Sequence, residues 1–234
     1  MIPGDESQTN PIIKFFIVLG MGFRGLFSSR FPVILKTLLL DVFLQRRLYR
    51  RSEGRWLIHA LIFYPFVFRF TWGMVGLLGS LWSPSGKWVW SMLDKNNMVT
   101  ALSFDLSGIL LLLGVLMAVC RETIARLQRK ISLPEQDPWS LLIIGGIVIV
   151  GFIAEGIRMA MMAMTGLPGE AEYALVGYWI SGLLSGVQGL STVYVYVWYT
   201  HAILVGAFVA YIPFSRLFHI IMAPVTLAMN AGRE

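Results

Sequence analysis

Five long stretches of apolar residues, separated by short polar or basic segments, run along the chain. Each approaches or reaches the roughly 20 apolar residues that a helix needs to cross a bilayer. Ten-residue segments of alternating character, which build membrane barrels, do not occur in the sequence. Because the backbone in lipid must then satisfy its own hydrogen bonds, the pattern predicts an all-α integral membrane bundle that forms a single domain. The predicted transmembrane helices cover residues 11–28, 56–82, 99–120, 139–164 and about 192–223.

Two shorter segments mix apolar and polar positions. Residues 31–51 combine apolar side chains with a run of arginines, which predicts an amphipathic helix at the membrane interface. Residues 173–190 are apolar but contain four glycines, so we expect a short outer interfacial helix or a re-entrant piece. A sixth span there would move the C-terminus to the other side of the membrane.

Composition supports the membrane assignment. Hydrophobic residues make up 56% of the chain and charged residues 14%, whereas soluble domains are about one quarter charged. The mean hydropathy is +0.70. Cys120 is the only cysteine, which excludes an internal disulfide, the thioether haem motif C-x-x-C-H and a self-contained iron–sulfur cluster. An iron–sulfur cluster in the same pathway would therefore belong to a partner subunit.

The basic residues indicate topology. They gather in two connections: Arg46, Arg47, Arg50, Arg51 and Arg55 before the second span, and Arg121, Arg126, Arg129 and Lys130 after the third. The positive-inside rule places both connections in the cytoplasm, so we expect the N-terminus outside and the C-terminus inside the cytoplasmic membrane. The net charge of +6 flanks membrane spans and does not form a soluble basic face. Binding to nucleic acid is therefore not expected.

The chain has three histidines, His59, His201 and His219, and each falls in a predicted span. A single histidine in a membrane helix could simply donate a hydrogen bond between helices. However, His201 and His219 are 18 residues apart, which on one helix places both rings on one face about 27 Å apart. His59 and His219 lie near the cytoplasmic ends of antiparallel helices. Two imidazoles that face each other at one depth are what a six-coordinate haem iron requires, so the spacing predicts b-type haem.

Two segments carry a resemblance to a known family. YTHAILVGAFVAYIPFSRLFHIIMAPV, residues 199–225, resembles the terminal helix of the gamma subunit of respiratory nitrate reductase in its histidine spacing and its PFSR-x-x-H segment. RWLIHALIFYPFVFRF, residues 55–70, resembles the histidine helix of related cytochromes b that accompany heterodisulfide-reductase-like iron–sulfur proteins and transmembrane redox complexes of sulfate reducers. Those relatives also have an arginine-rich interfacial stretch similar to DVFLQRRLYRRS, residues 41–52.

The resemblance implies a set of haem ligands. In the nitrate reductase gamma subunit, two histidines ten residues apart on the second helix pair with two on the fifth. Transferred to this chain, His59 pairs with His219 around a haem b on the cytoplasmic side. Ten residues after His59 stands Arg69, which cannot act as an ordinary iron ligand. Three outcomes stay open for His201: a distal haem held by His201 alone, a distal haem with an unexpected second ligand, or no distal haem.

Charged residues in the predicted outer half of the bundle form a second candidate site. Arg69, Asp105, Glu155 and Arg158 all lie within predicted spans, where charged side chains are rare. They could be ion pairs that join helices. Alternatively, the arginines could anchor haem propionates or bind a quinone, and a carboxylate could collect the protons that quinol oxidation releases. Both roles could hold together.

These observations predict an electron-transfer subunit of a quinol-linked oxidoreductase complex. Electrons would pass between a membrane quinone or quinol and an iron–sulfur partner subunit on the cytoplasmic side. The chain has no large hydrophilic domain for a second substrate, so we expect one subunit of a hetero-oligomer. Two alternatives are a polytopic transporter lined by the Arg, Asp and Glu residues and a haem-free membrane anchor. The absence of an inverted repeat speaks against the transporter.

Overall fold

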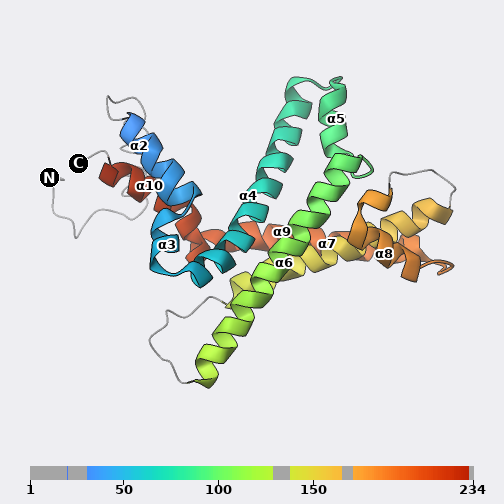
Figure 1. Cartoon of the computed structure of the whole chain (residues 1–234). Helices are drawn as coiled ribbons and strands as arrows, with labels where there is room; N and C mark the ends of the chain where they lie inside the picture. Colours follow the sequence, from blue (N-terminus) through green and yellow to red (C-terminus); the bar gives the residue numbers. More distant parts are fainter. Residues whose placement is uncertain (1–19, 21–30, 129–137, 165–170, 232–234) are drawn as a thin grey trace. The chain divides into compact units, whose positions relative to one another are not determined.

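The computed structural model describes residue 20 and residues 31–128, 138–164 and 171–231. Every regular element in these ranges is helical (Figure 1). Within them, four segments are long and apolar enough to cross a membrane: Glu53–Trp82, Lys87–Leu127, Pro138–Met164 and Leu190–Phe214. The all-α membrane architecture is thereby confirmed. The first predicted span, residues 11–28, lies outside the described residues apart from Gly20.

The chain divides into two compact units, and the single domain predicted from the sequence stays a prediction. One contains residues 1–56 and 216–234, and the other contains residues 57–215. The boundaries fall inside the long helix α4 (Glu53–Trp82) and just after the end of α9 (Leu190–Tyr211).

In the first unit, the predicted amphipathic segment is helical but broken. It consists of α2 (Phe31–Thr37), the π-helical turn η1 (Leu38–Phe43) and α3 (Arg46–Arg51). The break falls at Gln45, whose φ of 53° lies in the left-handed region and cannot continue a right-handed helix. Asp41 receives hydrogen bonds from Arg46 at 3.2 Å and from Arg47 at 2.9 Å, which ties α3 back to η1. The C-terminal helix α10 (His219–Ala231) packs against α2 and η1.

In the second unit, α4 and α5 (Lys87–Leu93) form a tight helical hairpin (Figure 1). Gly76 and Gly79 allow the close approach. A Cβ on Gly76 would come within 2.6 Å of Leu93, and one on Gly79 within 2.9 Å of Trp88. Helix α5 was not predicted from the sequence, because its seven residues are too few to show a clear helical period.

Helix α6 (Met98–Leu127) packs against both α4 and α7 (Pro138–Met164). Asn97 caps its start, since the Asn97 side chain accepts hydrogen bonds from the backbone amides of Val99 and Thr100. At the crossing with α4, a Cβ on Gly114 would lie 2.9 Å from the Cβ of Leu61 and 3.0 Å from its backbone carbon. Only a glycine therefore permits this separation of the two helices.

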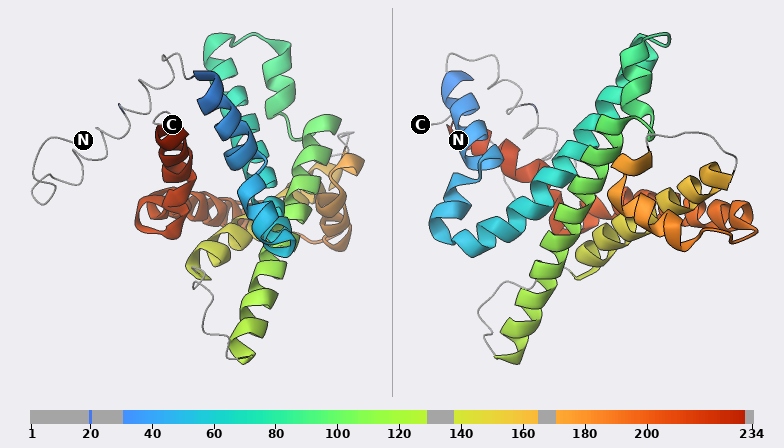
Figure 2. Two further views of the ribbon diagram at one scale, coloured as in Figure 1. Left: turned by 60° about the vertical axis from the view of Figure 1, so that its left-hand side comes forward. Right: turned by 45° about the vertical axis from the view of Figure 1, so that its right-hand side comes forward.

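Helix α7 lies beside both α9 and the short α8 (Leu175–Leu183), as the two views of Figure 2 agree. The nine residues of α8 are too few to cross a bilayer. This confirms the prediction that residues 173–190 contain a short helix and not a sixth span.

The fifth predicted span differs most from its expectation. Instead of one helix over 192–223, the chain has α9, two 3-10 turns (η3, Ile212–Phe214, and η4, Arg216–Phe218) and then α10. Pro213 lies at the break, because proline has no amide hydrogen with which to continue the helical ladder. His201 and His219 are consequently on different helices and in different units, and the expected single face that carries both rings does not exist.

Candidate functional site

The four charged residues predicted within the spans come together inside the second unit. Arg69 comes from α4, Asp105 from α6, and Glu155 and Arg158 from α7. Asp105 interacts electrostatically with both Arg69 and Glu155. The structure therefore joins three helices through one set of polar side chains, here called the polar cluster, which also includes Lys95, Asn96 and Ser107.

Arg69 fastens α4 to α6. Its Nε donates to the hydroxyl of Ser107 at 2.9 Å, and its Nη2 donates to the backbone carbonyl of Phe104. The guanidinium also lies over the Phe104 ring, with Cζ 5.2 Å from the centroid. Ser107 in turn donates to the Phe104 carbonyl at 2.9 Å. The resemblance implies a histidine at this position. Arg69, which stands there, lies instead in the contact between α4 and α6.

Asp105 holds the start of α8. Its side chain is buried, with the residue 4% exposed, and Oδ2 accepts a hydrogen bond from the backbone amide of Val176 at 2.6 Å. A carboxylate at a helix N-terminus satisfies free amides and meets the positive end of the helix dipole. Asp105 therefore has a structural role that the sequence did not reveal, because its partner is a backbone group 71 residues away.

Glu155 and Arg158 form the ion pair expected from their spacing on α7. The Arg158 Nη2 donates to Glu155 Oε1 at 2.6 Å, and its Nη1 donates to Asn96 Oδ1 at 2.6 Å. The Nε of Arg158 is buried and has no hydrogen-bond partner among the described residues. Gly177 of α8 lies against Glu155, where an added Cβ would come within 2.8 Å of the Glu155 side chain. The pair thus connects α7 to both α8 and the connection between α5 and α6.

Lys95 is the charged residue of the cluster that was not predicted from the sequence. It lies in the short connection between α5 and α6, and its Nζ is 3.3 Å from the centre of the Phe104 ring. No carboxylate oxygen in the described part of the chain lies within 4.0 Å of this ammonium. Counting Lys95, the cluster has three cations and two carboxylates. A lysine between two long apolar stretches is the signal that could have found it.

His201 lies on α9 and faces α7. A Cβ on Gly151 would be 3.2 Å from His201 Cε1, so the ring rests directly against the glycine. Gly151 is one helical turn from Glu155, which places His201 beside the polar cluster. The charges of Arg69 and Lys95 both act on the imidazole. The buried Nδ1 of His201 faces α7, where the backbone of Ile147 also interacts with the imidazole.

The other two histidines lie in different units. His59, near the start of α4, stacks on Phe63 with ring centroids 5.7 Å apart and an angle of 24° between the planes. His219 is the first residue of α10 and is exposed within its unit. Because the two residues belong to separate units, their predicted pairing around one haem stays a prediction.

The residues around His201 fit an axial haem ligand. An imidazole can coordinate iron only through a ring nitrogen that is not already bonded. Nδ1 of His201 lies against the backbone of Gly151 and Ile147 on α7, so Nε2 would be the ring nitrogen that binds iron. Arg69 is not available as its opposite ligand, since its guanidinium is bonded to Ser107 and Phe104. The described residues contain no cluster of three or more His, Cys, Asp or Glu side chains for a bare metal ion.

Comparison with protein families finds one match that covers most of the chain. The model of the HdrE family, described as a subunit of dihydromethanophenazine:CoB–CoM heterodisulfide reductase, matches residues 35–227. All three histidines and the whole polar cluster fall within this range.

Individual relatives agree. The chain is 30% identical over 208 residues to the HdrE protein of Methanosarcina mazei, covering 86% of this chain and 69% of that protein. The HdrE protein of Methanosarcina thermophila is 30% identical over 205 residues, which is 86% of this chain and 68% of the relative. The EtfAB:quinone oxidoreductase of Syntrophomonas wolfei is 24% identical over 76% of this chain and 25% of its own length. No solved structure matches the chain.

Proposed function

Since this chain belongs to the HdrE family of dihydromethanophenazine:CoB–CoM heterodisulfide reductase, we propose that it carries electrons between a lipid-soluble carrier and an iron–sulfur partner protein. Membership makes it a membrane cytochrome b that forms part of an oxidoreductase complex and works in electron transport. The heterodisulfide-reductase side of the predicted resemblance is confirmed, whereas the similarity to the nitrate reductase gamma subunit stays a prediction. The observation that supports the proposal most is the match to the HdrE family over residues 35–227, which contain all three histidines.

Haem b is the cofactor of this proposal. When bound, it supplies an iron centre that accepts and releases one electron at a time. His59 and His219 would hold one haem at the expected cytoplasmic side. His201 would hold a second one, for which Arg69 is not the opposite ligand. Gly151 lets the imidazole lie directly against α7.

The lipid-soluble carrier would bind beside the polar cluster. The names of the relatives specify dihydromethanophenazine in one case and a quinone in the other. Both are two-electron carriers, and their reduced forms release protons on oxidation. Lys95 and Arg158 offer hydrogen-bond donors to a ring oxygen or nitrogen, and Glu155 offers an acceptor for a proton. The excess positive charge of the cluster would stabilise negative charge that develops on the carrier.

The iron–sulfur partner would dock on the arginine-rich helix α3. Asp41 neutralises only Arg46 and Arg47, and the neighbouring Arg50 and Arg51 are exposed. An exposed basic surface favours an acidic partner by steering its approach. On the expected topology this surface lies in the cytoplasm, at the same side of the membrane as the His59 and His219 pair.

Replacement of the ligands tests the proposal. His219→Ala and His59→Ala should each remove the low-spin haem signal from the spectrum of the reduced protein, because one axial ligand is lost in each case. Met222→Ala, which changes a neighbouring residue on α10, serves as the matched control and should keep the signal. Persistence of the low-spin signal in either histidine variant would overturn the ligand assignment.

The polar cluster also suits the haem-free alternatives. Its hydrogen bonds join α4 to α6, α6 to α8, and α7 to the connection between α5 and α6, as a membrane anchor would need. Its charges could line a transport pathway. These alternatives predict a flat reduced-minus-oxidised spectrum for the purified protein, so the optical measurement separates them from the proposal.

A further inference from the structure

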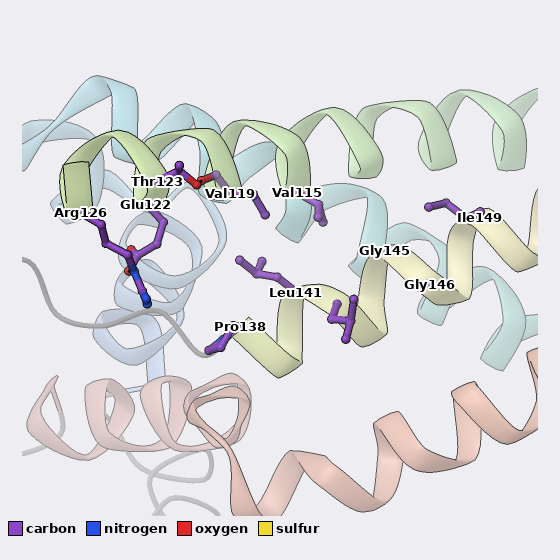
Figure 3. Close-up of a pocket in the computed structure, with 11 residues that line it drawn as sticks. Val115, Val119, Glu122, Thr123, Arg126, Pro138, Leu141, Gly145, Gly146 and Ile149 are labelled. Carbon is purple, nitrogen blue, oxygen red and sulfur yellow. Dashed lines mark hydrogen bonds and ion pairs between the residues drawn. The ribbon is translucent and has the colours of Figure 1, made fainter. Parts of the chain in front are cut away.

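A pocket of about 530 Å³ opens between the second half of α6 and the first half of α7 (Figure 3). Its volume lies in the range of small-molecule sites. All of its lining residues belong to the second unit, and none of them is a histidine. The pocket is therefore not a haem site, and it is separate from the polar cluster.

The lining changes character along the helices. Val115 and Val119 of α6 and Leu141 of α7 form apolar walls, whereas Glu122 and Arg126 lie at the other end (Figure 3). Val115 and Arg126 are 11 residues apart, which corresponds to about 16 Å along the helix axis. A site that is apolar at one end and charged at the other suits an amphiphile with a hydrocarbon tail and a polar head.

Arg126 has donors to spare at the mouth of the pocket. Its Nε donates to Glu122 Oε1 at 3.0 Å, and the side chain is 64% exposed. A guanidinium carries five N–H groups, of which this bond uses one. The planar fork matches the oxygen atoms of a phosphate group. The remaining donors of Arg126, which is paired with Glu122, can therefore bind the phosphate of a lipid head group.

In the sequence, this end of α6 leads into the basic connection after the third predicted span. Arg121, Arg129 and Lys130 accompany Arg126 at the end of this span and just after it. On the expected topology, this end meets the cytoplasmic leaflet, where anionic lipids gather and basic pockets between helices bind their head groups.

Two glycines leave room for the tail. Gly145 and Gly146 line the pocket, and a Cβ on Gly145 would meet nothing closer than Val115 Cγ1 at 3.5 Å. That distance is an ordinary van der Waals contact, so these glycines are not needed for close packing of α6 against α7. From the apolar walls, the charged mouth and this open floor, we propose that the pocket binds one anionic phospholipid, with its phosphate at Arg126 and an acyl chain between α6 and α7.

The inference is tested by measuring lipid binding to the purified full chain. If the chain purifies as part of a complex, the complex is used. After removal of native lipid, the protein is titrated with phosphatidylglycerol or phosphatidylcholine in detergent, and bound lipid is counted by native mass spectrometry. We expect one tightly bound phosphatidylglycerol and at least fivefold weaker binding of phosphatidylcholine. Inorganic phosphate alone should not compete, because it lacks the tail. Equal binding of both lipids, or displacement by phosphate, would contradict the proposal.

Variants separate the head and tail contributions. Arg126→Gln should weaken phosphatidylglycerol binding about fivefold, as expected for one basic residue at an anionic lipid. Arg121→Gln, a change on the same helix but outside the lining, should alter it less than twofold. Gly145→Leu should block the tail, and Gly145→Ala should preserve binding. Equal effects of the two arginine changes, or lipid binding retained in Gly145→Leu, would overturn the site. The readout does not depend on haem, so its failure would leave the proposed function untouched.

Discussion

At the scale of single residues, Arg69 shows how one substitution in an otherwise familiar pattern changes a site. It stands where the resemblance implies a histidine, yet two of its five N–H donors bond to the Ser107 hydroxyl and the Phe104 carbonyl. A charged residue in lipid is tolerated when its hydrogen bonds are satisfied. At a position where the resemblance implies a haem ligand, Arg69 therefore forms hydrogen bonds that join two helices.

We expect Arg69→Ala to lower the free energy of unfolding by about 2 kcal/mol, because hydrogen bonds to a charged group are lost and buried acceptors stay unpaired. Arg121→Ala, near the end of α6, should change it by less than about 0.5 kcal/mol. Reversible unfolding with sodium dodecyl sulfate, followed by circular dichroism, measures both. Equal values for the two variants would show that Arg69 does not hold α4 to α6.

The sequence identified four members of the polar cluster but not its connections. Arg69, Asp105, Glu155 and Arg158 were recognisable because charge is rare within apolar spans. Lys95 and Asn96 escaped notice because they lie in a connection, where polar residues are ordinary. The amide of Val176 could not be foreseen as the partner of Asp105, since backbone groups look alike in every sequence.

At the scale of helices, the long apolar runs predicted α4, α6 and α7 closely, because the thickness of a bilayer fixes the length of a span. The prediction was wrong at the end of the fifth span, where a single residue and not the long apolar pattern marks the end of the helix. Hydropathy predicted that the fifth span runs through Pro213. In the structure α9 ends just before Pro213, which has no backbone N–H to continue the helical hydrogen bonds. His201 and His219 lose their common helix at this break.

Glycines at helix crossings give a test at this scale. Gly114→Ala should destabilise the protein by about 1–3 kcal/mol, because the new methyl group would press on the backbone of α4 at Leu61. Gly206→Ala on α9 meets nothing within 4 Å and should be neutral or slightly stabilising. Thermal unfolding in one detergent compares the pair. Equal shifts would contradict the close crossing of α4 and α6.

At the scale of the whole molecule, the distribution of basic residues determines the expected topology. We expect the C-terminus in the cytoplasm. Green fluorescent protein fused after Glu234 should therefore fluoresce, and alkaline phosphatase fused at the same place should stay inactive. The reason is the arginine bias of the two connections that the positive-inside rule assigns to the cytoplasm. Active alkaline phosphatase at the C-terminus would reverse the orientation, and with it the expected side of the partner and of the lipid pocket.

The central claim is that this membrane protein holds haem b. A reduced-minus-oxidised optical spectrum of the purified protein, with a pyridine haemochrome assay per mole of chain, tests it most directly. We predict a b-type alpha band and at least one haem b per chain; a second equivalent that disappears in His201→Ala would assign His201 as its ligand. A flat difference spectrum from the purified, intact protein would contradict the account.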